Sequence, residues 1–413
     1  MTADVRPFTE AAEGTGPAEL DYRGPQGWAT VVHRAHVGSF TLLGRLGPPG
    51  AEHTDLVREF EPEQHRTEEP RTWEYRVGLS GPQRLRIEAA ERWSISVTPL
   101  EQDEPEDGGV FCRRGIGNQT VELPEPEPES KSGGGAILEF TRIESVRPTS
   151  LFLRLHTGFG DQTYWPVGND DRARFLYGHD TPAVWSTAGR VEVANAAGCE
   201  WRLRVLPLSA ARPLEEATRG TGAEVLAHTG APAALALCSL ADAGSTSKAE
   251  VRIESRGYKV TLSADHHHAT EGWVVGLGPG PTLLQTGGAG GWELVTTPLD
   301  TVPTFDGEIT GTGGKVLRYT GPPVTARVTT ESWHKWAGMV SVRTLTPELL
   351  WKDWVNTKGG LAGRLRGERL DLRPGTPLTI TGPHDGSGWR IRIERGQGRG
   401  HGRGQGHERG QSL

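Results

Sequence analysis

Two short sequence markers recur four times along the chain at a nearly constant separation. A Gly-x-Gly followed by a short alternating run opens four segments, at Gly14, Gly115, Gly220 and Gly311. A strand-like run that starts with tryptophan closes them, at Trp93, Trp201, Trp292 and Trp389. The openings recur at intervals of 101, 105 and 91 residues, and the closing tryptophans follow their openings by 79, 86, 72 and 78 residues. A chain with such a period folds as a row of similar units, not around one core.

The closing runs indicate that each unit is built from half-buried strands. Apolar and charged residues alternate along them: Trp389, Ile391 and Ile393 share one face, while Arg390 and Arg392 share the other. A tryptophan at the start of such a strand is expected to fill the core of a sandwich. The opening Gly-x-Gly predicts a turn or a β-bulge in which a glycine has positive φ.

Further short runs of alternating residues, bounded by turn residues, lie between the two markers of each segment. The 57 glycines and 29 prolines of the 413 residues favour short strands joined by turns. Helical periodicity is confined to the stretch from Thr346 to Asn356. The predicted fold is therefore all-β: four tandem antiparallel β-sandwich repeats, of jelly-roll or immunoglobulin-like type, with a disordered C-terminal tail.

Composition shifts divide the chain into six predicted parts. In repeat two, a run rich in Pro, Glu, Ser and Gly from Pro124 to Gly135 replaces a short turn, and the end of the chain lacks apolar residues before Leu413. The predicted limits are repeat one at 1–100, an acidic linker at 101–112, repeat two with its Pro/Glu loop insertion at 113–209, repeat three at 214–300, repeat four at 305–395 and a disordered Gly/Arg/His tail at 396–413.

Charge and cysteine content exclude several classes of partner. The formal net charge of -7 and a pI near 6.1 give no general attraction to nucleic acid or anionic lipid, so nucleic-acid contact is expected only through the basic tail. The sequence shows no secretory signal and no apolar run that could insert into a membrane, and a cytoplasmic protein is expected. Three cysteines without close pairing predict free thiols.

The order of these markers resembles small β-sandwich repeats in proteins of GC-rich bacteria. The residues that carry the resemblance are the Gly-x-Gly opening, an early strand with His33 and Phe40, and a terminal Gly-x-Trp-x-Ile strand; the best-matching stretches are Gly14 to Val97 and Gly311 to Ile393. Repeats two and three lack the early aromatic residue, and repeat three also lacks the histidine. The resemblance implies a sandwich fold and a modular binding role, and it implies no catalytic residue.

Candidate catalytic groups are few. The chain has no Gly-x-Ser-x-Gly, His-Glu-x-x-His, Walker loop or Cys-x-x-Cys motif, so a non-enzymatic protein without a cofactor is expected. Asp265, His266 and His268 form the sharpest candidate for a metal site: alternate residues of a strand share a face, so His266 and His268 can share a metal, and Asp265 would have to join them from an irregular loop. An exposed hairpin tip is the competing interpretation of the same residues.

Repeat four carries more tryptophan than one small core needs. Trp333, Trp336, Trp351 and Trp354 lie within about two dozen residues, and exposed aromatic side chains are common anchors for proteins and carbohydrates. In the competing interpretation, Trp333 and Trp336 flank a turn, while Trp351 and Trp354 line a short helix packed on the sheet.

The sequence therefore predicts a non-enzymatic scaffold or binding protein that recognises a protein partner. Binding of a carbohydrate, an envelope polymer or another small ligand, and metal-dependent hydrolysis at Asp265, His266 and His268, are the two alternatives.

Overall fold

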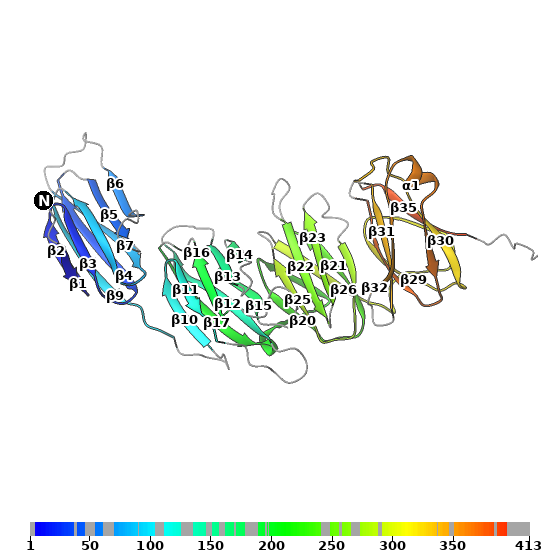
Figure 1. Cartoon of the computed structure of the whole chain (residues 1–413), viewed down its shortest axis with the longest axis horizontal. Helices are drawn as coiled ribbons and strands as arrows, with labels where there is room; N and C mark the ends of the chain where they lie inside the picture. Colours follow the sequence, from blue (N-terminus) through cyan, green and yellow to red (C-terminus); the bar gives the residue numbers. More distant parts are fainter. Residues whose placement is uncertain are drawn as a thin grey trace, which may run out of the picture. The chain divides into compact units, whose positions relative to one another are not determined.

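A computed structural model of the chain confirms the all-β prediction. It describes residues 5–36, 39–45, 54–60, 70–89, 91–103, 111–124, 135–145, 151–156, 162–168, 171–177, 189–194, 196, 198–240, 248–255, 258–265, 273–287, 291–336, 338–346, 351–383 and 386–394. Within these residues the only helices are the single-turn α1 (Leu361–Leu365) and the 3₁₀ turn η2 (Leu208–Ala210). The strands form eight sheets, two for each sequence repeat (Figure 1). The predicted acidic linker, Pro/Glu loop and C-terminal tail lie largely or wholly outside the described residues.

The sheets of repeat one have the strand orders β1-β3-β8-β5-β6 and β2-β9-β4-β7. The strands are β1 Arg6–Phe8, β2 Ala11–Thr15, β3 Ala18–Tyr22, β4 Gly27–Ala35, β5 Ser39–Arg45, β6 Thr54–Phe60, β7 Arg71–Leu79, β8 Gln83–Ala89 and β9 Arg92–Pro99.

The sheets of repeat two have the strand orders β11-β16-β13-β14 and β10-β17-β12-β15. The strands are β10 Phe111–Ile116, β11 Gln119–Glu122, β12 Ala136–Ser145, β13 Leu151–His156, β14 Gln162–Gly168, β15 Arg172–Tyr177, β16 Arg190–Ala194 and β17 Cys199–Pro207.

The sheets of repeat three have the strand orders β18-β20-β25-β22-β23 and β19-β26-β21-β24. The strands are β18 Arg212–Pro213, β19 Ala217–Thr221, β20 Val225–His228, β21 Ala233–Ser239, β22 Lys248–Ser255, β23 Tyr258–Asp265, β24 Trp273–Leu277, β25 Thr282–Gly287 and β26 Gly291–Pro298.

The sheets of repeat four have the strand orders β27-β29-β34-β31-β32 and β28-β35-β30-β33. The strands are β27 Thr304–Phe305, β28 Ile309–Thr312, β29 Lys315–Tyr319, β30 Val324–Thr330, β31 Val340–Leu345, β32 Trp351–Thr357, β33 Glu368–Leu372, β34 Pro377–Thr381 and β35 Gly388–Ile393.

One topology recurs in all four repeats, and it is that of a jelly roll. Leaving aside the short first strand of repeats one, three and four, the eight remaining strands form one sheet of the order first, eighth, third, sixth and another of the order second, seventh, fourth, fifth. This arrangement, in which the chain crosses between the sheets, distinguishes the jelly roll from the immunoglobulin-like alternative. The extra strands β1, β18 and β27 pair in parallel with β3, β20 and β29. The prediction of purely antiparallel sheets is therefore wrong for these three sheets.

The two sequence markers meet in one contact that joins the first and last strands of the eight. Gly311 on β28 lies opposite Trp389 on β35, and a Cβ at Gly311 would lie 2.6 Å from the indole Cζ2 atom. The indole Nε1 donates to the carbonyl oxygen of Gly313 at 2.8 Å, and Gly313 has a φ of 62°. The first glycine therefore makes room for the ring, and the second supplies the turn and the hydrogen-bond acceptor.

The same contact closes the other three repeats. The indole N–H groups of Trp93, Trp201 and Trp292 donate to the carbonyls of the second glycines at 2.8–2.9 Å, and a Cβ on each first glycine would lie 2.4 or 2.5 Å from the ring. All four tryptophans are fully buried. We call this arrangement the glycine–tryptophan closure. It confirms the core position predicted for the tryptophans and the positive φ predicted for the openings.

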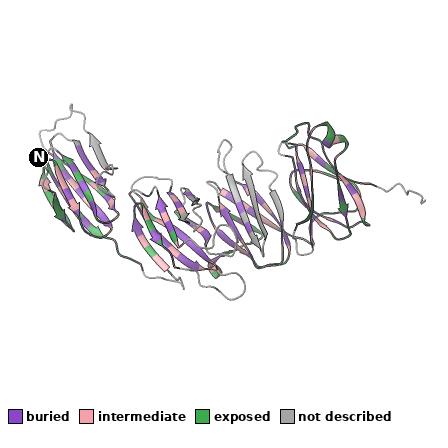
Figure 2. Ribbon diagram, viewed as in Figure 1, coloured by how far each residue is buried: buried purple, intermediate pink, exposed green. Residues whose placement is uncertain are grey.

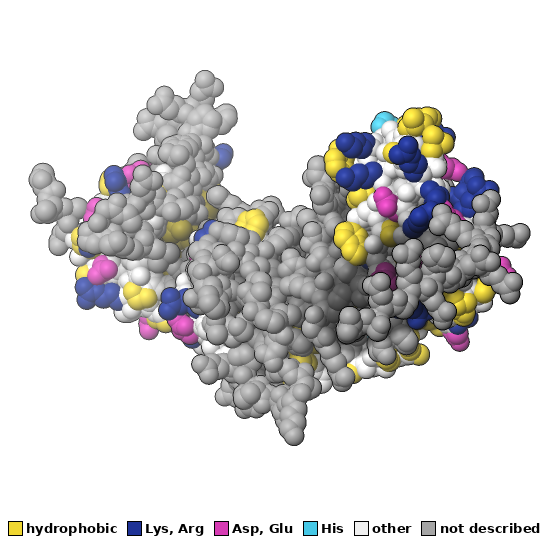
Figure 3. Space-filling model, turned by 45° about the vertical axis from the view of Figure 1, so that its right-hand side comes forward, with side chains coloured by type: hydrophobic (Ala, Val, Ile, Leu, Met, Phe, Trp, Pro, Cys, Tyr) yellow, Lys and Arg dark blue, Asp and Glu magenta, His cyan; other side chains and the backbone are white. Residues whose placement is uncertain are grey.

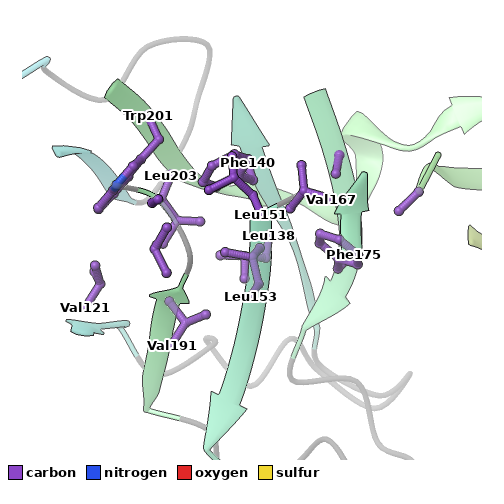
Figure 4. Close-up of a cluster of buried hydrophobic side chains, with 14 of the residues drawn as sticks. Val121, Leu138, Phe140, Leu151, Leu153, Val167, Phe175, Val191, Trp201 and Leu203 are labelled. Carbon is purple, nitrogen blue, oxygen red and sulfur yellow. The ribbon is translucent and has the colours of Figure 1, made fainter. Parts of the chain in front are cut away.

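In repeats one, two and four, alternating apolar residues from both sheets form the core beside the closing tryptophan. In repeat two the cluster runs from Trp201 through Phe140 and Leu138 to Phe175 (Figure 4). Buried residues occupy sheets of all four repeats (Figure 2). Burial does not alternate along β12, because both of its faces are covered. Leu138 faces the core of repeat two, and Ile137 on the opposite face packs against Val225 of repeat three.

The contacts divide the chain into two compact units. The first contains Met1–Thr229, Ser239–His267 and Pro281–Leu294; the second contains Gly230–Cys238, His268–Gly280 and Val295–Leu413. Repeat three thus contributes strands to both units. The limits predicted for the individual repeats stay predictions.

Within the first unit, a buried carboxylate joins repeat one to repeat two. Glu200, next to the closing Trp201, accepts hydrogen bonds from the indole Nε1 of Trp28 and from Nε of Arg114, the latter at 2.6 Å. Gly78 also lies against Ile116, so closely that a Cβ would be 2.4 Å from its Cγ2 atom. A polar group without water must be hydrogen-bonded, and here the partners come from two repeats.

Replacing Gly311 by Ala should destabilise repeat four, because the added Cβ collides with the fully buried Trp389 ring. Overpacking of this kind costs about 1–3 kcal/mol. Gly307→Ala is the matched control, since a Cβ at Gly307 meets nothing within 4 Å. Hydrogen exchange of the β29 and β34 amides should accelerate in Gly311→Ala alone; equal rates in both variants would contradict the packing argument.

Replacing Glu200 by Ala should uncouple repeats one and two, because Trp28 and Arg114 lose a buried acceptor. Loss of one partner of a buried charged pair costs roughly 3–5 kcal/mol. Glu122→Ala, which breaks the exposed pair with Arg190, is the control and should have little effect. Calorimetry of the full chain should show a lower-temperature transition for the Glu200 variant only.

Candidate functional site

Two of the four predicted tryptophans lie on an exposed loop of repeat four. Residues 331–339 connect β30 to β31, and the side chains of Trp333 and Trp336 are 66% and 65% exposed. A buried indole contributes strongly to a protein core, and the exposed rings of Trp333 and Trp336 make no such contribution. Two exposed indoles on one loop therefore favour a role in binding over a purely structural role.

The other two predicted tryptophans lie on a strand, so the helical interpretation is wrong for Trp351 to Asn356; residues 347–350 of the predicted stretch lie outside the described residues. Trp351 begins β32, which pairs with β31, and Trp354 lies within the same strand at 64% exposure. Val355 packs against the core, so the neighbouring Trp354 side chain faces outward. The backbone hydrogen bonds to β31 thus outweigh the helical tendency that the three-residue spacing of Trp351 and Trp354 suggests. The side chain of Trp351 lies outside the described part of the structure.

A second loop packs against the tryptophan loop and holds it in place. It contains α1 and connects β32 to β33. The backbone N–H groups of Gly359 and Gly360 donate to the carbonyls of Lys335 and Ser332 at 3.2 and 2.9 Å. A Cβ at Gly359 would lie 2.0 Å from the His334 carbonyl oxygen, so only glycine allows this approach.

Cationic side chains cover faces of both open tryptophan rings. The Arg364 guanidinium lies 4.0 Å from the ring centroid of Trp333. The Lys358 and Lys335 ammonium groups lie 4.9 and 5.4 Å from the Trp336 centroid. All three distances fall within the range of cation–π attraction.

Two leucines of α1 extend the apolar part of this region. Leu361 and Leu365 are one helical turn apart on the same side of α1 and are 61% and 70% exposed. Gly363, on the opposite side, is buried. We define the tryptophan–cation surface as Trp333, Lys335, Trp336, Lys358, Leu361, Arg364 and Leu365. Figure 3 shows hydrophobic side chains interspersed with Lys and Arg on this repeat.

Exposed large hydrophobic residues concentrate in this part of the chain. Of the seven found among the described residues, five lie between positions 333 and 365; the two outside it are Ile143 and Leu240. Clustered apolar exposure is more typical of interaction sites than single exposed apolar residues are.

Sequence reasoning missed α1, the two exposed leucines and the three cations. The flanking Gly360 and Gly367 and the Leu361–Leu365 spacing were the available signals for a short helix. The pairing of Trp333 with Arg364 had no sequence signal, because it joins two loops that come together only in the folded repeat.

The predicted metal site stays a prediction. Asp265 ends β23, while His266 and His268 lie outside the described residues. Among the residues that are described, no group of three or more His, Cys, Asp or Glu side chains is placed to hold a metal ion.

Cys199 and His33, two other reactive side chains, are in structural positions. Burial raises the pKa of Cys199 to about 11, which keeps it a thiol at neutral pH. His33 is a core residue between Phe40 and Trp73, at ring distances of 4.9 and 5.4 Å. Burial lowers the pKa of His33, and its Nε2 atom has no hydrogen-bond partner among the described residues.

Comparison with protein-family models and with curated proteins finds no match for this chain. No helix in the described part is long and apolar enough to cross a membrane. The fold and the surface define a class only: tandem jelly-roll repeats with an aromatic and cationic surface on the last repeat.

The lowered pKa of His33 predicts that repeat one loses stability in mild acid. As the pH falls below about 6.5, the unfolded chain binds a proton at this histidine while the folded repeat does not, so protonation favours unfolding. His33→Phe keeps an aromatic ring and removes the titration. Urea unfolding should show a smaller loss of stability between pH 7.5 and 5.5 in the variant; an unchanged loss would exclude this role.

Proposed function

We propose that this protein is a cytoplasmic, non-enzymatic scaffold of tandem jelly-roll repeats that recognises a protein partner through the tryptophan–cation surface of repeat four. The observation that carries the proposal is the exposure of Trp333 and Trp336 beside Arg364. Trp and Arg are the residues most enriched among the energetic anchors of protein interfaces.

The way the surface is built supports a role in binding. The two loops are tied by backbone hydrogen bonds and by a glycine contact, so the backbone that carries the rings is held in position before a partner arrives. Preorganised side chains lose less conformational entropy on binding than mobile ones. Repeat four therefore presents its anchors on a rigid jelly-roll frame.

Carbohydrate binding is the alternative that the exposed indoles also support. Sugar rings stack on free aromatic faces, whereas Arg364, Lys335 and Lys358 already occupy faces of the two rings. The arrangement thus favours a partner that uses the cations together with the rings. Glycan-array binding by the intact protein would support the alternative.

Removing the indoles should abolish capture of the partner without unfolding the chain. The double variant Trp333→Ala/Trp336→Ala loses two anchors, each contributing about 2 kcal/mol, so its affinity should fall by roughly a thousandfold. Ile143→Ala/Leu240→Ala is the matched control, because it removes exposed apolar side chains from other repeats.

The measurement is affinity capture from lysate of the native organism with the intact protein and both double variants, followed by titration of the captured protein. Melting profiles of the three proteins should coincide, since the replaced side chains are exposed. Equal capture by all three would contradict the proposal. Loss of capture in both double variants would also contradict the proposal, because it would show that binding does not depend specifically on the tryptophan–cation surface.

A further inference from the structure

Several arginines of repeat four outside the tryptophan–cation surface form ion pairs with carboxylates. Arg327 and Arg369 pair with Glu394, and Arg392 pairs with Glu308. Among the described residues, no carboxylate pairs with the side chains of Lys335, Lys358, Arg364 or the adjacent exposed Arg366. Four cations without an ion pair in the described part of the chain therefore lie on these two loops, although the chain as a whole has a formal charge of -7.

The contacts with the rings leave these cations able to bind an anion. A guanidinium carries five N–H donors and an ammonium three, and attraction to a ring face satisfies few of them. The Arg364 fork can bind a carboxylate through two hydrogen bonds while its carbon atom stays over Trp333. Lys335 and Lys358 flank one ring and offer a second anion position.

The leucines beside the cations require an apolar group in the same ligand. Leu361 and Leu365 expose most of their side chains, and burial of one such side chain contributes about 1.5–3 kcal/mol. A ligand that satisfies the whole surface therefore combines several negative charges with at least one apolar side chain. A short acidic peptide segment has this composition.

The charge of the whole chain disfavours the two other common anionic macromolecules. A formal net charge of -7 gives no general attraction to nucleic acid or to anionic lipid. Insertion into a bilayer would carry the cations toward hydrocarbon along with the rings, which is costly. An acidic protein segment places its carboxylates at the cations without displacing them.

We infer that the tryptophan–cation surface binds an acidic segment of its partner, whose carboxylates pair with Arg364, Lys335 and Lys358 and whose apolar side chain packs on Leu361 and Leu365. This inference rests on the proposed function and specifies the chemistry of the partner.

Peptide titration of the full chain tests the inference. The probe is a fluorescein-labelled peptide of sequence Asp-Glu-Leu-Glu-Asp-Glu-Leu-Glu, and its control replaces every acid by the matching amide. We expect the acidic peptide to bind at least about tenfold more tightly than the amide peptide, and its affinity to fall as salt rises. Equal affinities, or no binding of the acidic peptide, would overturn the inference.

Charge reversal locates the binding. The triple variant Lys335→Glu/Lys358→Glu/Arg364→Glu should bind the acidic peptide more than about tenfold more weakly than the unchanged protein. Lys315→Glu, at an exposed lysine on β29 of the same repeat, should keep the affinity of the unchanged protein. Retention by the triple variant would overturn the inference. So would tighter binding of phosphatidylserine vesicles or of oligothymidine, which would identify a membrane or a nucleic acid as the ligand.

Failure of the inference can be separated from failure of the proposed function. If the cellular partner is lost by the tryptophan variants but kept by the triple charge variant, the surface binds a protein and the acidic chemistry is wrong. If neither set of variants affects capture, the proposed function fails as well.

Discussion

Each repeat depends on the contact between one buried indole and two glycines. A jelly roll brings its first and last strands together as neighbours, and closing such a long loop is entropically unfavourable until a specific contact forms. The closure supplies that contact: Gly311 lets the Trp389 ring approach the backbone, and the Gly313 carbonyl satisfies the indole N–H that would otherwise be buried without a partner. Both sheets then bury their inner faces around the same ring.

The closure also explains how much of the fold could be predicted. It needs specific residues at Gly14, Gly16 and Trp93 and at the equivalent positions, so it leaves a sequence signal, and the all-β class follows from it and from strand alternation. Topology left no comparable signal, because which strands pair is decided between segments far apart in sequence. The parallel strand β1 has only three residues, too few for a periodic pattern.

The candidate site was predictable in part for a similar reason. Clustered tryptophan is visible in sequence, and Trp333, Trp336 and Trp354 are indeed exposed. The helical expectation for Trp354 failed because pairing of β32 with β31 overrides local spacing. The cations could not be predicted, because Arg364 contacts Trp333 from a different loop. The two loops come together where Gly359 lies against the carbonyl oxygen of His334.

The short parallel strands β1, β18 and β27 have a consequence for how such a chain avoids misassembly. Tandem copies of one topology offer one another equivalent sheet edges, and an open edge can accept a strand from the wrong neighbour. In repeats one, three and four, the residues that enter the repeat first lie along the edge of β3, β20 or β29. One edge of each of these sheets is therefore a strand of only two or three residues, which offers a strand from another copy few backbone groups to pair with.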